Sequence, residues 1–264
     1  MKALLDLVER TLDEVLPPAD ERPASLSAAM RYAVGAGGKR IRPLVCLSSS
    51  VAVGGAAEAA RYPAAAIELL HNYTLVHDDL PAMDNDRERR GKPSVWVKFG
   101  EANAILAGDA LLALSCRVAA RAPRNVAAIV DVLGEMGVGV VRGQVEDVAQ
   151  GGPAAGSPRR PAPNDDFVYV HKTADLFMAA AAMGGLAGGG AAADIAALRD
   201  FARNLGLAFQ YEDDLIDGDG LYPRGETERM VREATAAALA ALDRLPGDTS
   251  FLRDLARKLA GRTV

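Results

Sequence analysis

Apolar residues recur at helical spacing from the start of this chain to about residue 150, and short proline- or glycine-rich breaks divide that stretch. The breaks lie near residues 16–18, 35–38 and 54–55 and at Pro81. Alanine is abundant, while β-branched residues seldom form the alternating runs that strands require. The sequence therefore predicts a series of consecutive helices, and we expect an all-α protein.

The second half of the chain continues this pattern after one interruption. Residues 151–166 are rich in proline and glycine and predict an exposed loop. Helix is expected again from near Phe167 to about Ile216, and a last amphipathic stretch begins near Glu226. No boundary would leave two separate cores, so we predict a single domain over residues 1–264.

Composition limits the partners of the chain. The formal net charge of −5 shows no basic excess of the kind that nucleic acid requires, so any phosphate site must be local. Cys46 and Cys116 lie too far apart in sequence for a metal-type spacing, and a reducing cytoplasm fits them. Residues 176–193 carry no charge, but they are mostly alanine and glycine. We expect a packed internal helix there, with no stable membrane insertion and no export.

The first acidic cluster follows an apolar helical run and contains Asp78, Asp79, Asp84 and Asp86. Six residues separate Asp78 from Asp84, about 240° around a helix, so an unbroken helix would aim their side chains apart. Pro81 predicts that the helix ends there, which would let Asp84 curl back from a loop.

The second acidic cluster contains Glu212, Asp213, Asp214 and Asp217. Asp213 and Asp217 are four residues apart, so they would share one helix face, which costs stability unless a cation neutralises them. Oxygen ligands of this kind suit Mg²⁺, although Mn²⁺ is also possible. The alternative for either cluster alone is a solvated helix end with acidic decoration.

Basic residues that would reach phosphates lie in three places. Lys39, Arg40 and Arg42 stand beside a glycine pair, although this segment alone is as consistent with a solvated turn. Arg89 and Arg90 follow the first acidic cluster, and Lys172 and Thr173 offer a cation and a hydroxyl. His71 would donate a hydrogen bond to a phosphate. The alternative is a satisfied core residue, which a lone histidine on an apolar helix more often is.

Together these motifs resemble the trans-polyprenyl diphosphate synthase family, over roughly residues 30–220. The motifs that carry the resemblance are Gly-Gly-Lys-Arg-x-Arg-Pro at residues 37–43, Asp-Asp-x4-Asp at 78–84, Arg-Arg-Gly at 89–91, Gly-Gln-x2-Asp at 143–147, Lys-Thr at 172–173 and Phe-Gln-x2-Asp-Asp-x2-Asp at 209–217. The resemblance implies a helical isoprenoid synthase-type bundle around a central cavity, and a homodimer.

The resemblance also implies a reaction, in which isopentenyl diphosphate is joined to an allylic diphosphate to give farnesyl (C15) or geranylgeranyl (C20) diphosphate. It assigns metal binding to the carboxylates Asp78, Asp79, Asp84, Asp213, Asp214 and Asp217. It assigns contacts with the allylic diphosphate to Arg89, Lys172 and Gln210, and contacts with isopentenyl diphosphate to Lys39, Arg42, His71 and Arg90. Thr173 and Gln144 would face the reacting carbons or support their neighbours.

Product length should depend on what blocks the space beneath Asp78. Tyr73 is large and lies five positions upstream, while Thr74, one turn below Asp78, is small. The resemblance therefore favours C15, with C20 a close second, unless Tyr73 is simply part of the core.

One departure from the family pattern stands out after the second acidic motif. The resemblance leads us to expect a flexible glycine-rich loop with a further lysine that closes over the phosphates. Here residues 218–225, which follow Asp217, do not form such a loop, and there is no lysine between Lys172 and Lys258. Either the loop is lost or the chain carries an additional mobile segment there, and we expect the mobile segment because such lids are among the least stable parts of a structure.

Two other functions compete with a prenyltransferase. A class I terpene cyclase also ionises prenyl diphosphates, but it would lack a clamp such as residues 37–43 and would carry a different second metal motif. A non-catalytic or regulatory subunit would keep the fold without activity. Its aspartates should be degraded, and here they are intact.

Overall fold

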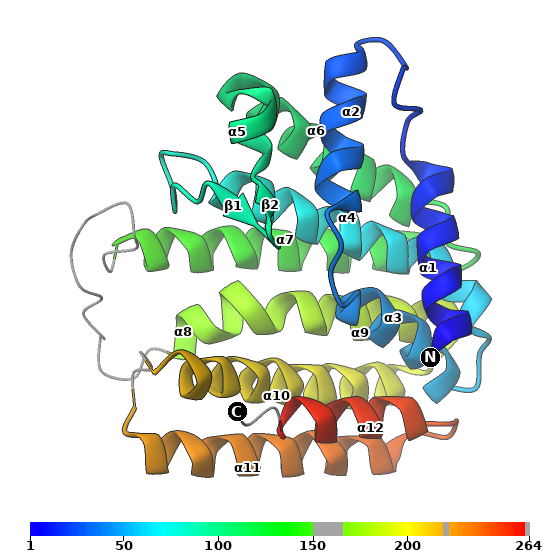
Figure 1. The fold of residues 1–264 in the computed structure, drawn as a ribbon. Helices are drawn as coiled ribbons and strands as arrows, with labels where there is room; N and C mark the ends of the chain where they lie inside the picture. The colour runs from blue at the N-terminus through cyan, green and yellow to red at the C-terminus, as the bar shows by residue number, and fades with distance from the viewer. Residues whose placement is uncertain (150–165, 219–221, 262–264) are drawn as a thin grey trace.

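The structure is a computed structural model that describes residues 1–149, 166–218 and 222–261. The predicted loop at 151–166 lies outside the described residues, apart from the backbone of Asp166. Helices account for nearly all of the regular structure (Figure 1). In chain order they are α1 (Lys2–Val15), α2 (Ala24–Gly35), α3 (Ile41–Ala52), η1 (Ala57–Ala60), α4 (Arg61–Asp78), α5 (Val95–Phe99), α6 (Glu101–Ala119), α7 (Val126–Ala149), α8 (Asp166–Val168), η3 (Tyr169–Ala174), α9 (Asp175–Gly188), α10 (Ala192–Asp217), α11 (Arg224–Ala241), η4 (Leu242–Arg244) and α12 (Ser250–Leu259).

The all-α prediction is confirmed, and the helices follow the predicted breaks closely. α1 ends before the proline pair at 17–18, and the glycine-rich residues 35–38 separate α2 from α3. The elements that were not predicted include the short helix α5 and an antiparallel ribbon in which β1 (Glu88–Arg89) pairs with β2 (Lys92–Pro93). The ribbon is too short to show a periodicity in the sequence.

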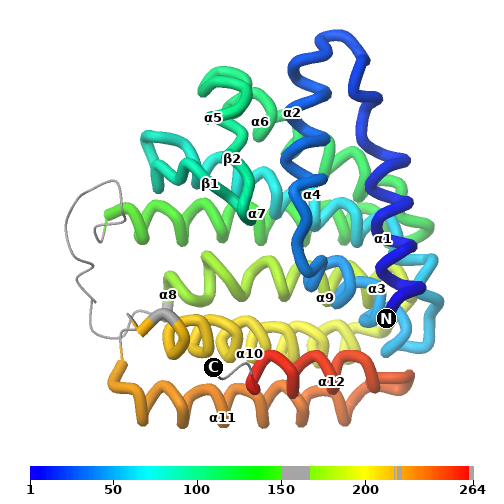
Figure 2. The backbone as a smooth tube through the Cα atoms, in the orientation of Figure 1, coloured from blue at the N-terminus to red at the C-terminus, as the bar shows by residue number. Residues whose placement is uncertain are grey.

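The axes of α7, α9, α10 and α11 lie one beside the next and roughly parallel, and α1 and α2 run at a steep angle to them (Figures 1 and 2). The helix α9 lies at the centre, with residues 179–183 fully buried. Its glycines allow close approach, because a Cβ at Gly184 would come within 3.0 Å of the Cα of Cys46. The expected internal helix is therefore present.

A single helix among the described residues is long and apolar enough to cross a membrane, judged by length and composition alone. It is α6, and 39% of its most apolar window is buried. The core helix of a soluble protein passes the same test, so this is weak evidence.

The turn after α4 brings the first acidic cluster together as the sequence predicted. The helix ends at Asp78, and the amide of Asp84 donates to the carbonyl of Asp78 at 2.8 Å. The backbone of Asn85 takes the left-handed conformation, with φ of 55°. Asp84 therefore folds back over the end of the helix that carries Asp78 and Asp79.

A π-helical turn, η3, interrupts the helix that carries Lys172 and Thr173, and it was not predicted. A Cβ at Gly143 of α7 would lie 2.6 Å from the amide nitrogen of Lys172, so only glycine permits this approach of α7 to η3. Turns of this kind are often found at functional sites.

The expectation of an additional mobile segment after the second acidic motif is wrong. The sequence is continuous between Asp217, where α10 ends, and Arg224, where α11 begins, and only residues 218–223 connect them. The longer lysine-bearing loop that the resemblance implied is therefore absent from this part of the chain.

Candidate active site

The first acidic cluster places three carboxylates in surroundings that disfavour their charge. Burial raises the pKa of Asp78 to about 7, with Asp84 and Asp79 adding to the rise and Lys172 opposing it. Burial also raises the pKa of Asp79, which accepts hydrogen bonds from Arg89 at 2.9 and 2.5 Å, and that of Asp84. A cation bound between these carboxylates would stabilise their charged form and offset the cost of burying it. The cluster therefore has the character of a cation site.

The second acidic cluster lies on α10 and is tied to η3. Both carboxylate oxygens of Asp214 accept hydrogen bonds from protein groups, Oδ1 from Gln210 at 3.1 Å and Oδ2 from the hydroxyl of Tyr169 at 2.5 Å. Asp213 is partly buried, and its charge acts on Arg42 across the site. The side chain of Asp217 lies outside what the structure describes.

Lys172 and Thr173 link the two acidic clusters. The ammonium group of Lys172 donates to Oδ2 of the buried Asp147 at 2.5 Å, and its charge also opposes the rise in pKa of Asp78 and Asp84. The hydroxyl of Thr173 donates to Oε1 of Gln210 at 2.9 Å. The π-turn thus directs one cation toward the first cluster and one hydroxyl toward the second.

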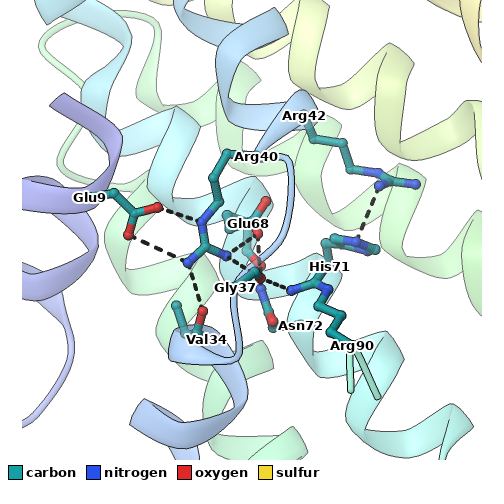
Figure 3. A network of polar contacts seen from close by, with 9 residues as sticks. All are labelled: Glu9, Val34, Gly37, Arg40, Arg42, Glu68, His71, Asn72 and Arg90. Atoms are coloured by element: carbon teal, nitrogen blue, oxygen red, sulfur yellow. Dashed lines mark hydrogen bonds and ion pairs between the residues drawn. The ribbon is translucent and has the colours of Figure 1, made fainter. Parts of the chain in front are cut away.

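In the basic segment between α2 and α3, Arg40 is bound on several sides by other protein groups (Figure 3). The guanidinium of Arg40 is buried and donates to Oε1 of Glu68 at 2.7 Å, to Oε1 of Glu9 at 2.8 Å and to the carbonyl of Val34 at 2.7 Å. Lys39 is exposed. Of the three neighbouring cations, Arg40 therefore holds the segment in place and is not available to a phosphate.

The remaining cations of this region lie around His71. Nη1 of Arg42 donates to Nε2 of His71 at 3.2 Å, so the imidazole is neutral and carries its proton on Nδ1. Burial and the nearby cations Arg42 and Arg90 hold the pKa of His71 well below its ordinary value, and burial lowers the pKa of Arg42 to about 10. Nδ1 of His71 and Nε of Arg42 are buried N–H donors that have no partner in the structure.

Arg90 reaches the same place from the ribbon. It donates from Nη1 to the carbonyl of Gly37 and packs over Gly38, where a Cβ would lie 2.7 Å from its guanidinium carbon. Two unsatisfied donors lie here beside several cations, and the cations lower the pKa values of their neighbours. Such a place suits an anion with many acceptor oxygens.

A largely apolar cavity of about 260 Å³, partly open to the surface, has Asp78 in its wall. Tyr73 and Thr74 of α4, the two residues predicted to govern length, line it together with Gln144 and Val145 of α7. The cavity therefore joins an ionic region at one end to a hydrophobic region at the other.

The chemistry of the donors fits Mg²⁺ held jointly with a phosphate ligand. Among the described residues, no three acidic, histidine or cysteine side chains are gathered closely enough to hold an ion by themselves. Mg²⁺ is usually bound through one or two carboxylates together with waters and substrate phosphates. The raised pKa values of Asp78, Asp79 and Asp84 show that their negative charges are unfavourable here, and a bound cation would stabilise those charges.

Sequence reasoning left three residues of this site without a role. Asp147 holds Lys172, Tyr169 holds Asp214, and Glu68 holds Arg40. Asp147 belongs to a motif that the sequence did single out, and that motif was the available signal. Tyr169 and Glu68 lie outside every such motif, and their partners are far away in sequence.

The fold and the site together define an α-helical protein built to hold anionic groups at the mouth of an apolar cavity. A profile of the family described as Polyprenyl synthetase matches residues 23–222. The chain belongs to this family, the trans-polyprenyl diphosphate synthases.

Two sequence relatives illustrate the similarity. The chain is 41% identical over 227 residues to the heterodimeric geranylgeranyl pyrophosphate synthase large subunit 1 of Arabidopsis thaliana, covering 80% of this chain and 58% of that protein. It is 41% identical over 219 residues to the geranylgeranyl diphosphate synthase of Cyanophora paradoxa, covering 80% of this chain and 71% of that protein. The chain thus spans little more than half the length of the Arabidopsis relative.

Solved structures match the fold over almost its whole extent. The geranylgeranyl pyrophosphate synthetase of Pyrococcus horikoshii superposes with a TM-score of 0.88 at 29% identity, covering 98% of this chain and 96% of that one. An FPP/GFPP synthase of Zymomonas mobilis gives a TM-score of 0.88 at 32% identity, covering 98% and 97%.

Proposed function

We propose that this protein is a short-chain trans-prenyltransferase, which condenses isopentenyl diphosphate with an allylic diphosphate. The observation that carries the proposal is the arrangement around Asp78. Carboxylates with raised pKa values lie at the mouth of an apolar cavity, and His71 and Arg42 present unsatisfied donors to a separate anion site. Two diphosphates, one of them with an apolar tail, match these features.

The roles of the residues follow from charge. We assign metal binding to Asp78, Asp79 and Asp84 of the first cluster and to Asp213, Asp214 and Asp217 of the second, and Mg²⁺, when bound, would supply positive charge that stabilises the leaving diphosphate. Mn²⁺ is an alternative. Lys172, Arg89 and Gln210 contact the allylic diphosphate, which lowers the barrier to ionisation of its C–O bond.

Lys39, Arg42, His71 and Arg90 hold isopentenyl diphosphate, with the Nδ1 proton of His71 donated to a phosphate oxygen. The fixed position of this diphosphate keeps the isopentenyl double bond close to the allylic cation, so that carbon–carbon bond formation becomes effectively intramolecular. A proton then leaves to the departing diphosphate. Thr173 and Gln144 face the reacting carbons or support their neighbours.

For product length we propose C20, with C15 as the alternative that Tyr73 favours. Support for C20 comes from the names of both sequence relatives, which are geranylgeranyl diphosphate synthases. Support for C15 comes from the bulk of Tyr73 on the cavity wall.

We also propose that two copies of the chain pair through α6 and α7, because both helices expose large apolar side chains. Leu106 of α6 and Val138 of α7 are 57% and 52% exposed, and neither side chain lines the apolar cavity. A cytoplasmic location remains part of the proposal, supported by two free cysteines.

A second candidate function is a non-catalytic subunit of a prenyl synthase. The observation in its favour is the short connection between α10 and α11, which lacks the expected lysine. The intact aspartates argue against it.

The test is an assay of the purified chain with Mg²⁺, labelled isopentenyl diphosphate and, separately, C5, C10 and C15 allylic primers. A C15 or C20 diphosphate product is expected. If no primer is extended while the protein is folded, the non-catalytic subunit becomes the better account, and catalysis would have to be sought in a complex with a partner.

A further inference from the structure

The wall of the apolar cavity contains a pair of rings in contact that the reaction itself does not explain. Tyr73 and His77 lie one helical turn apart on α4, and both line the cavity. Their ring centroids are 4.9 Å apart at an interplanar angle of 71°, an edge-to-face contact. The position of the Tyr73 ring is therefore coupled to that of the His77 ring.

The ring of His77 is in turn fixed by α6. Its Nε2 donates to the carbonyl of Ile105 at 3.0 Å, and Oδ1 of Asp109 lies 3.8 Å from the same nitrogen. The ring occupies the space where Gly108 has no side chain. A Cβ at Gly108 would lie 3.1 Å from Cε1 of His77 and closer still to Nε2 and Cδ2, so no other residue can stand there without moving the imidazole.

We propose that Gly108 and His77 are specificity-determining residues that set the length of the prenyl tail by positioning Tyr73. This inference rests on the proposed function, because it takes the cavity beneath Asp78 as the place of the tail. Gly108 lets His77 sit against α6, and His77 holds the Tyr73 ring at the wall. The chain length that the cavity accepts is therefore controlled partly from α6, outside the helix that carries Tyr73.

Two substitutions should move the wall in opposite directions. In Gly108→Ala, the new methyl group displaces the imidazole from α6 into the cavity and toward Tyr73, so the cavity shortens. In His77→Ala, the imidazole is removed, which enlarges the cavity and frees the Tyr73 ring to turn aside. Hydrophobic pockets discriminate ligands that differ by a methylene by roughly tenfold or more, so a displaced ring should be readily measurable.

The experiment measures binding and does not depend on turnover. The full chain with Mg²⁺ is titrated with geranyl, farnesyl and geranylgeranyl S-thiolodiphosphate, which do not ionise readily, by isothermal calorimetry. For Gly108→Ala the ratio of C20 to C10 affinity should fall by roughly tenfold, and for His77→Ala it should rise. Gly134→Ala on α7 is the matched control, because a Cβ there would have no neighbour within 4 Å, and its ratio should match that of the unmodified chain.

The double variant decides whether the effect of Gly108 runs through His77. In a His77→Ala background the added methyl group has no ring to displace, so Gly108→Ala should no longer change the affinity ratio. If the ratio changes by the same factor with and without His77, or if neither single variant changes it, the inference is overturned. Loss of turnover with the expected binding ratios would instead contradict the proposed reaction and leave this inference standing.

Discussion

The two ionic halves of the site are built in different ways. In the basic half, the protein balances much of its own charge: Arg40 is paired with Glu68 and Glu9 inside the fold, and Arg42 is held against a neutral His71. In the acidic half, Asp78, Asp79 and Asp84 retain raised pKa values despite Arg89 and Lys172. The basic half is therefore assembled before any ligand arrives, whereas the acidic half depends on added cations.

The largest expected effect lies in the acidic half. Asp78→Ala and Asp213→Ala each remove a carboxylate that would hold positive charge at the leaving diphosphate, so turnover should fall by a factor on the order of 10²–10³. Circular dichroism should show an intact fold. Asp131→Ala, an exposed aspartate on α7, serves as the control and should keep full activity. Normal rates in both active-site variants would rule out the metal assignment.

Removal of a buried partner tests the preassembled half. Arg40→Met leaves Glu68 buried without its cation, so the free energy of unfolding should drop by about 3–5 kcal/mol. The control is Arg229→Met, which loses only exposed ion pairs and should cost at most about 1 kcal/mol. Chemical denaturation of both variants gives the comparison. Equal losses would mean that the Arg40 pair does not hold the segment.

In the metal-free protein, the pH dependence of the free energy of unfolding should reveal the raised pKa of Asp78. Because its folded-state pKa of about 7 lies above its ordinary value, the folded state keeps a proton that the unfolded chain has released. The contribution of Asp78 to stability is therefore full below about pH 4 and is lost as the pH rises through 7.

Asp78→Asn removes this dependence. In the presence of a chelator, the variant should be more stable than the unmodified chain at pH 8, by about 2–4 kcal/mol, and should lose that advantage at pH 4. Thermal unfolding at the two pH values measures it. An advantage that does not change with pH would contradict the raised pKa.

A smaller effect is expected where the second acidic cluster meets η3. Tyr169→Phe removes the hydroxyl that donates to Asp214 and leaves the ring in place. The expected loss is about 1–3 kcal/mol in the free energy of unfolding, because the buried carboxylate of Asp214 loses one hydrogen bond. A neutral Tyr169→Phe would show that Asp214 finds another donor.

The sequence predicted those parts of the site that depend on local geometry. The turn at Pro81 and the return of Asp84 follow from the helical repeat and from what proline does to a helix, so they were predicted before the structure. The split between Arg40 and Arg42 was not predictable, because the two arginines look alike in sequence. The distant Glu68 and Glu9, which bind Arg40, make that arginine structural.

The π-turn that carries Lys172 and Thr173 also escaped prediction. Its sequence has ordinary helical spacing, and the close approach of Gly143 that accompanies it depends on packing between separate helices. The pairing of Gly108 with His77 belongs to the same category. A glycine stands in a helix at each of these close contacts. The sequence alone does not show which residue of another helix lies against each glycine.

Metal-dependent binding measured by calorimetry tests the contrast between the two halves most directly. Isopentenyl diphosphate should bind with similar affinity with and without Mg²⁺, because its clamp is already assembled from Arg42, His71 and Arg90. Geranyl S-thiolodiphosphate should bind tightly only when Mg²⁺ is present. If both ligands require the metal to the same degree, or if neither does, the account of a preassembled basic half and a cation-dependent acidic half is wrong.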